Sequence, residues 1–145
     1  MIRRFHFIWL LALLLLGFAP AAEEKRLAIY SPQTGFTVPV IDHDGHEYVS
    51  ITDLLDPFGQ ASLKKEGKRW RLRFEGNGKT VEGEFRDGSA EAKIHGKKIA
   101  LGQPFWSDNQ RGYIPVPATP FVMLNFVPGS ATLRGSSRRL FLGDV

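Results

Sequence analysis

Cysteine is absent from this chain of 145 residues. Its absence excludes disulfide bonds and thiolate chemistry, so the fold must be stabilised by packing alone. A lipoprotein anchor is excluded as well, because its acyl chains are attached to a cysteine that follows an apolar leader. The chain must therefore fold without covalent cross-links.

A strong charge of one sign is also missing. The chain has 19 basic and 15 acidic side chains. Arg3 and Arg4 belong to an N-terminal leader, so 17 basic side chains remain against the 15 acidic ones, a balance near +2. This excess is too small to indicate nucleic-acid binding, which needs a strongly basic face. We therefore expect no nucleic-acid partner.

The N-terminus has the pattern of a secretory signal peptide. A basic start is followed by an apolar run over residues 7–18 and by small side chains at Ala19 and Ala21. An uncleaved membrane anchor is the alternative, but the run is shorter than the ~20 residues that span a hydrocarbon core. The sequence predicts that residues 1–21 are removed. It also predicts export to the periplasm or cell envelope, with membrane contact only before cleavage.

The rest of the chain, roughly 124 residues, suffices for one domain over residues 25–145. Its apolar residues alternate over short runs between glycine-containing turns, which is typical of strands and hairpins. Residues 27–30 are expected to form an edge strand. Residues 38–41 are expected to pair with residues 47–49 across a turn.

Two short helices interrupt this β pattern. In the first, Ser50 is placed to cap the N-terminus while Asp53 reaches back, and Gly59 is placed as a left-handed C-terminal cap. In the second, Thr119 is the expected N-cap and Pro120 the first helical residue. Both helices are expected to be short, and the first to be about two turns long.

Two consecutive hairpins are the clearest local prediction. They turn around residues 66–67 and 76–77, and both turns contain glycine. The resulting pairs on the apolar face are Leu63 with Trp70 and Leu72 with Val81. Because the two registers agree, both hairpins are expected to bury the same face.

The opposite face of these hairpins carries charges. The same register pairs Arg71 with Glu82 and Arg69 with Glu84, and such pairs contribute about 0.2–1 kcal/mol each. Three lysines are left without a partner in this register: Lys64, Lys65 and Lys68. An anionic ligand would bind at these lysines, and the alternative is an ordinary solvated face.

A strand–helix–hairpin unit occurs twice. Residues 44–51 lead into a helix and the hairpin that contains Trp70, and residues 111–116 lead into a helix and the hairpin that contains Leu140. Because both units present one apolar face, the sequence predicts an α+β domain. In it, a twisted antiparallel sheet of hairpins wraps around two short helices, and the strand–helix–hairpin unit is a pseudo-repeat.

The repeated strand resembles the hallmark of a known domain family. Gly45-His46-Glu47-Tyr48-Val49-Ser50-Ile51 and Gly112-Tyr113-Ile114-Pro115-Val116 are similar to the motif G-x-x-Y-V-P-[LV], except that Ser50 stands where proline is usual. On this motif, roughly residues 27–145 resemble the copper amine oxidase N-terminal-like domain of bacterial envelope proteins.

Within that family, the chain is similar to the segment that precedes the catalytic domain of exported N-acetylmuramoyl-L-alanine amidases. Residues 136–143 resemble the last strand of that segment. The resemblance implies an accessory or targeting domain of a peptidoglycan amidase, with peptidoglycan or an envelope protein as partner. The zinc-dependent catalytic domain would lie beyond Val145, so we expect no catalysis by this chain. The alternative is a free-standing periplasmic interaction or scaffold domain.

Residue types that carry catalysis or bind metals have structural interpretations here. His43, His46 and Glu47 form H-x-x-H-E, but a turn separates the histidines and keeps them off one helical face, so no metal site is predicted. The acidic pairs that could serve glycoside hydrolysis are Asp53 with Asp56 and Glu82 with Glu84. Their places, at a helix start and opposite arginines, are structural. We expect neither catalytic residues nor a cofactor.

Phe105 and Trp106 are the better candidates for a binding role. They lie in the polar loop 102–112, outside the alternating apolar pattern. A sugar ring or a peptide could stack on exposed aromatic rings there. The alternative is that Trp106 folds back and closes one end of the core. The predicted ligand contacts are therefore Phe105, Trp106, Lys64, Lys65 and Lys68.

Overall fold

The computed structural model describes residues 24–143, and the predicted signal peptide lies outside the described residues. Three sheets form within this range. Sheet A has the order β12 (Ala131–Arg134), β13 (Arg139–Leu142), β1 (Arg26–Tyr30), β2 (Gly35–Pro39). Sheet B has the order β10 (Trp106–Ser107), β11 (Gly112–Pro115), β4 (His46–Ser50), β3 (Ile41–His43). Sheet C has the order β5 (Gln60–Glu66), β6 (Arg69–Gly76), β7 (Lys79–Arg86), β8 (Glu91–Ile94), β9 (Lys97–Ala100).

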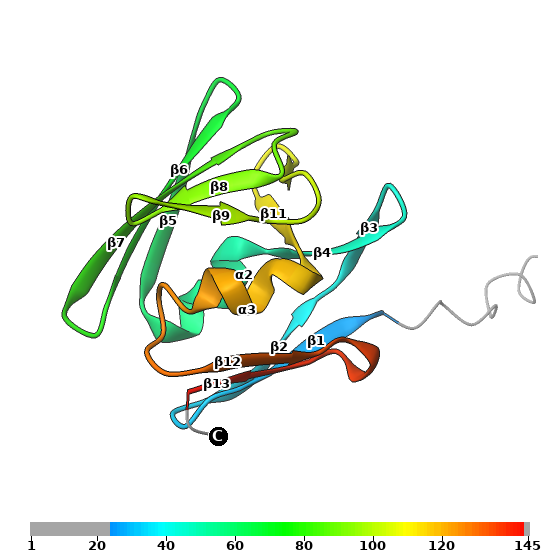
Figure 1. Ribbon diagram of the computed structural model, residues 1–145, viewed down its shortest axis with the longest axis vertical. Coiled ribbons are helices and arrows are strands. Elements are labelled where there is room, and N and C mark those ends of the chain that lie inside the picture. The colour runs from blue at the N-terminus through cyan, green and yellow to red at the C-terminus, as the bar shows by residue number, and fades with distance from the viewer. Residues whose placement is uncertain (1–23, 144–145) are drawn as a thin grey trace, which may run out of the picture.

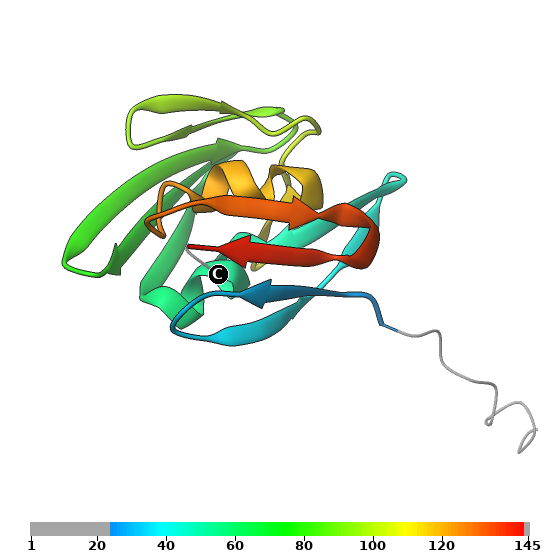
Figure 2. The same ribbon diagram turned by 60° about the horizontal axis from the view of Figure 1, so that its bottom comes forward.

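Two short α-helices lie between sheet C and sheet A (Figure 1, Figure 2). They are α2 (Ile51–Leu55) and α3 (Thr119–Met123), and 3-10 turns form η1 (Asp56–Phe58), η2 (Val116–Ala118) and η3 (Gly135–Ser137). The α+β class is therefore confirmed, although the hairpins form three sheets instead of one. No helix within residues 24–143 has the length and apolar character needed to traverse a bilayer.

Strand β1 is a central strand, so the predicted edge position is wrong. It pairs antiparallel with β2, where Leu27 lies opposite Val38, and parallel with β13, where Ala28 lies opposite Arg139. The parallel pair also departs from the expected all-antiparallel sheet. Val38 therefore pairs with β1, and only Ile41 of the expected 38–41 segment joins the hairpin, in which β3 pairs with β4.

The two hairpins of sheet C form with a register shifted by two residues. Leu63 lies opposite Leu72, and Phe74 lies opposite Val81. The second turn is Asn77-Gly78, and both residues have positive φ, as a type I′ turn requires. A shift of two keeps every side chain on its predicted face, so the buried face is correct although the partners are not.

The helix ends differ from the prediction at three points. Ser50 caps α2 as expected, because its hydroxyl accepts the Asp53 amide, but the Asp53 carboxylate pairs with Arg111 at 3.0 Å instead of reaching back. Gly59 is extended, with φ 168°, so it is no left-handed cap. Thr119 is the first residue of α3 and follows η2 directly, so it is not the N-cap. Its hydroxyl donates to the Val116 carbonyl at 2.7 Å.

One core joins the sheets and the helices. Trp70, Leu72 and Phe74 alternate along β6, and each is at most 2% exposed. Leu54 of α2 and Met123 of α3 are fully buried in the same cluster. The two-residue periodicity of β6 therefore supplies one wall of the core, and the short helices fill the space beside it.

Candidate ligand-binding site

Strands β4 and β11 carry the two motif copies and lie side by side. Their pairs are Tyr48 with Pro115, Val49 with Ile114, and Ser50 with Tyr113. The register is symmetric about the middle pair, and each strand leads into a helical segment: β4 into α2, and β11 into η2 and α3. Both motif tyrosines therefore contact one side chain, Trp106.

The tyrosine hydroxyls hold the segment around Trp106 in place. Tyr48 donates to the Pro104 carbonyl at 2.8 Å, and Tyr113 donates to the Asp108 carboxylate at 2.8 Å. Burial, followed by the bond to Asp108, raises the pKa of Tyr113 to about 12. The pKa of Asp108 is lowered, first because its carboxylate accepts the Gln110 amide. At neutral pH the phenol therefore remains a donor to a charged acceptor.

Both faces of the Trp106 ring are covered. His43 stacks on it at 4.2 Å between ring centroids, and Tyr113 stacks on it at 4.4 Å. Two rings on the same face would also touch each other, and the described rings of His43 and Tyr113 do not, so they occupy opposite faces. A sugar ring has no free face of Trp106 on which to stack in this conformation.

Phe105 is a core residue, so its predicted role as an exposed ligand contact is wrong. It is 1% exposed, and its ring stacks on Phe85 at 5.1 Å. Its backbone accepts from the Gly88 amide at 2.9 Å and donates to the Ser89 carbonyl at 2.8 Å. These two hydrogen bonds fix the loop to the β7–β8 turn and direct the ring inward, which a local pattern of polar residues does not reveal.

A cleft of about 590 Å³ opens beside Trp106. The polar and charged side chains that line it include His43, Asp44, His46, Lys65, Asp87 and Ser107. The Asp87 carboxylate is already engaged, because it accepts from the Ser107 hydroxyl at 2.5 Å and from the Trp70 indole at 3.4 Å. The cleft can bind a polar ligand through the Lys65 amine and the histidine nitrogens, with Trp106 as an apolar contact.

The three predicted lysines do not form one patch. Lys65 lies opposite Trp70 on the inner face of sheet C, with its amine 5.6 Å from the centre of the Trp70 ring. Lys64 lies opposite Arg71 on the outer face, because neighbouring side chains of a strand point to opposite sides. Lys68 lies in the turn between β5 and β6. Only Lys65 lines the cleft beside Trp106.

Of the H-x-x-H-E residues, the two histidines stay together and Glu47 lies apart from them. His43 and His46 face each other across the β3–β4 hairpin, and the His43 ring lies 3.3 Å from the Asp44 carboxylate. Glu47 faces elsewhere and binds Arg138. Within residues 24–143, no three His, Asp or Glu side chains gather closely enough to hold a metal ion.

Glu47 is the centre of an ion-pair network that ties β4 to the start of β13. The Arg138 guanidinium donates to both of its carboxylate oxygens, at 2.9 and 2.5 Å. The Lys25 amine lies 3.3 Å from Glu47 and 3.2 Å from Asp42. The hydrogen bond from Arg138 is the main reason why the pKa of Glu47 is lowered.

We expect Glu47→Gln to reduce the free energy of unfolding by about 1–2 kcal/mol at pH 7, because an amide cannot replace a doubly bonded carboxylate. The folded-state pKa of Glu47 lies below its unfolded value of about 4.3. The stabilisation is therefore complete above that value and lost as the pH falls through the folded pKa. Urea denaturation of the wild-type protein and of Glu47→Gln, repeated from pH 7 to pH 2, measures this difference in the free energy of unfolding.

The matched control for this substitution is Glu66→Gln. Glu66 lies 3.5 Å from Arg71, and its side chain is 55% exposed. We expect a change below about 0.5 kcal/mol there, because exposed pairs contribute little. A stability gap for Glu47→Gln that stays constant across the pH range would contradict the ion-pair explanation.

One member of each acidic pair binds an arginine. Asp53 binds Arg111 at 3.0 Å, and Glu84 binds Arg69 at 2.6 Å. The latter contact is diagonal, since Arg71 lies directly opposite Glu84 and the predicted pairing of Arg71 with Glu82 is wrong. The pKa of Asp56 is raised, mainly because its carboxyl group is partly buried.

Sequence reasoning found Trp106 but missed its surroundings. Tyr48 and Tyr113 could have been found, because both occupy the aromatic position of the repeated motif. His43 reaches the cleft from the end of β3 and Asp87 from the turn after β7, and no spacing in the sequence relates them to Trp106. Comparison with family models, with curated proteins and with solved structures finds no match to the chain.

Proposed function

We propose that this protein is an exported, non-catalytic envelope module that binds peptidoglycan as the accessory or targeting domain of an N-acetylmuramoyl-L-alanine amidase. The observation that carries the proposal is the symmetric pairing of the two motif strands, Tyr48–Ser50 against Tyr113–Pro115. This pairing supports the resemblance to the copper amine oxidase N-terminal-like domain, whose hallmark is this strand.

The pseudo-repeat is part of this proposal. β4 leads through α2 to the hairpin of β5 and β6, and β11 leads through α3 to the hairpin of β12 and β13. The two halves therefore share the order strand, helix, hairpin, and their first strands are neighbours. A duplicated unit that buries one face against its copy explains this arrangement.

The cleft beside Trp106 is the proposed binding site for the wall fragment. Stacking on Trp106 is blocked by His43 and Tyr113. The ligand is therefore bound through polar groups at the rim, where Lys65 supplies an exposed cation. Carboxylates of peptidoglycan stem peptides are suitable partners for this amine.

Sedimentation with purified sacculi tests this function. We expect the exported, purified chain to sediment with sacculi, and Lys65→Glu to weaken the retention about five-fold, because it places a like charge opposite the ligand's carboxylates. Lys79→Glu is the matched control, since Lys79 lies at the start of β7 and does not line this cleft. Recovery of all wild-type protein in the supernatant would rule out peptidoglycan targeting.

A free-standing interaction domain is the second candidate. Phe121 and Leu124 are 61% and 46% exposed, and they lie three residues apart at the end of α3, where they share a face. Exposed apolar pairs of this kind occur at protein contacts. Sedimentation with sacculi distinguishes the two candidates, because an interaction domain requires no retention on sacculi.

A further inference from the structure

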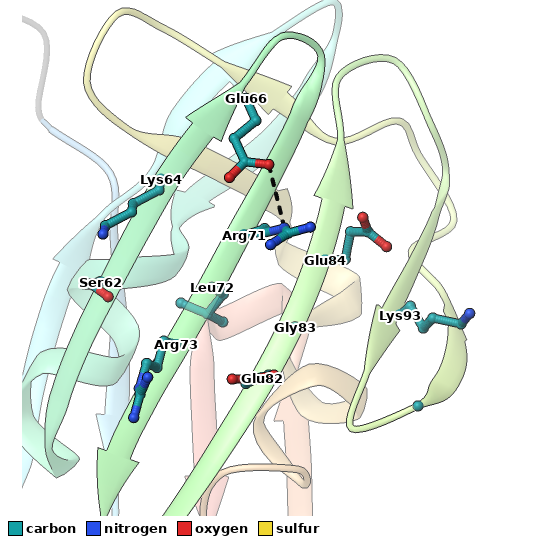
Figure 3. Close-up of a pocket in the computed structure, with 11 residues that line it drawn as sticks. Ser62, Lys64, Glu66, Arg71, Leu72, Arg73, Glu82, Gly83, Glu84 and Lys93 are labelled. Atoms are coloured by element: carbon teal, nitrogen blue, oxygen red, sulfur yellow. Dashed lines mark ion pairs between the residues drawn. The ribbon is translucent and has the colours of Figure 1, made fainter.

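The outer face of sheet C has a second hollow, of about 590 Å³, on the side away from the helices (Figure 3). Its lining combines four cations with three carboxylates: Lys64, Arg71, Arg73 and Lys93, with Glu66, Glu82 and Glu84. These residues come from β5, β6, β7 and β8, so the hollow runs across the strands.

Some of these charges are paired within the protein. Arg71 lies 3.5 Å from Glu66, and Arg73 lies 3.0 Å from Glu75. Glu84 binds Arg69 at 2.6 Å. These contacts account for both arginines of the hollow and for two of its three carboxylates.

Three charges remain. Lys64, Glu82 and Lys93 form no ion pair and no side-chain hydrogen bond with any residue in the range 24–143. Lys64 also lies directly opposite Arg71. Lys93 lies between Lys98 and Glu84, and the Glu84 carboxylate binds Arg69 instead of Lys93. Like charges in opposite positions are destabilising. Each margin of the hollow therefore carries a lysine that has no carboxylate within ion-pair distance among the described residues.

We propose that this hollow binds a short extended peptide that carries two carboxylates with one amine between them. Lys64 on β5 and Lys93 on β8 are separated by three strand spacings, about 14 Å. Glu82 lies on β7, between these two strands, and two residues along the strand from Glu84, which is in register with both lysines but binds Arg69. An extended peptide repeats its side chains on one face every ~6.6 Å, so charges at its first, third and fifth residues span about 13 Å. The two carboxylates meet the lysines, and the amine meets Glu82.

This inference rests on the proposed function only for its biological source, because peptidoglycan stem peptides combine carboxylates with free amines. The charge pattern on sheet C is independent of the cleft beside Trp106. The two surfaces share no lining residue. They can therefore be tested separately.

The experiment is an NMR titration of the exported, isotope-labelled chain with acetyl-Glu-Ala-Lys-Ala-Glu-amide. We expect saturable shifts of backbone amides around Gly83, and at least about ten-fold weaker binding for the double variant Lys64→Gln, Lys93→Gln. Lys64→Arg with Lys93→Arg should retain binding. The matched control is Lys79→Gln with Lys97→Gln, which removes the same charge outside the hollow and should leave the affinity unchanged.

Peptide variants complete the test. Replacing both glutamates by glutamine, or the lysine by glutamine, should each weaken binding. Absence of shifts, or shifts that are insensitive to Lys64 and Lys93, would overturn the inference. Sacculus retention that depends on Lys65, without any binding of the peptide, would leave the proposed function standing while this inference fails. Peptide binding without sacculus retention would give the reverse result.

Discussion

Replacing Gly59 by alanine is expected to lower the free energy of unfolding by about 3 kcal/mol, which is a decrease in Tm of about 10 °C. A Cβ atom at this position would lie 2.3 Å from the Glu75 carbonyl oxygen and 3.0 Å from the Gly76 Cα atom. Both contacts are with backbone, so no side chain can rotate to relieve them. The chain following α2 must therefore separate from the end of β6. Thermal and urea denaturation measure the loss.

Gly35→Ala is the matched control for this effect. A Cβ atom at Gly35 would meet only the Ile29 carbonyl oxygen, at 3.8 Å, which is an ordinary contact. We expect a change within about 0.5 kcal/mol for this variant. If Gly59→Ala were equally stable, the close approach of residue 59 to β6 would be wrong. The conformation of Gly59 itself cannot cause the loss, because φ 168° is extended and open to any residue.

Gly59 illustrates which parts of the fold the sequence predicts. The helix after Ser50 follows from local signals, a capping side chain and apolar residues at helical spacing, and both are present in the structure. Glycine is the residue type expected at a helix cap, but the role of Gly59 depends on its contact with Glu75 of β6, which is 16 residues further along the chain. A local pattern cannot distinguish a left-handed cap from a close backbone contact.

The same distinction explains the errors in the sheets. Alternation along β6 predicts its buried face, and the two-residue register shift preserves that face. The position of β1 depends on β13, which lies at the other end of the chain, and short apolar strands carry no signal for their order in a sheet. Fold class and faces were therefore predictable, whereas strand order and pairing partners were not.

In the candidate site, the loop that contains Trp106 could be found because its aromatic residues interrupt a polar segment. The different roles of Phe105 and Trp106 could not be predicted. Phe105 and Trp106 are neighbours in the chain, and strand geometry sends them in opposite directions. One ring enters the core against Phe85, and the other lies between His43 and Tyr113 at the cleft.

Truncation of Phe105 should therefore act on stability. We expect Phe105→Ala to reduce the free energy of unfolding by about 3–4 kcal/mol, because it removes a ring that is 1% exposed and leaves a cavity against Phe85 and Trp70. The ring also lies within 2.4 Å of where a Cβ of Gly112 would be, so β11 packs directly on it. Urea denaturation followed by circular dichroism measures the change.

Phe121→Ala is the matched control, since it removes the same atoms from a side chain that is 61% exposed. Its cost should stay below about 0.5 kcal/mol. A small effect of Phe105→Ala, combined with loss of ligand binding by the folded variant, would contradict the core assignment and restore Phe105 as a contact residue. A large effect instead means that Phe105 anchors the segment 103–107. In that case the position of Trp106 at the cleft depends on the packing of the residue before it.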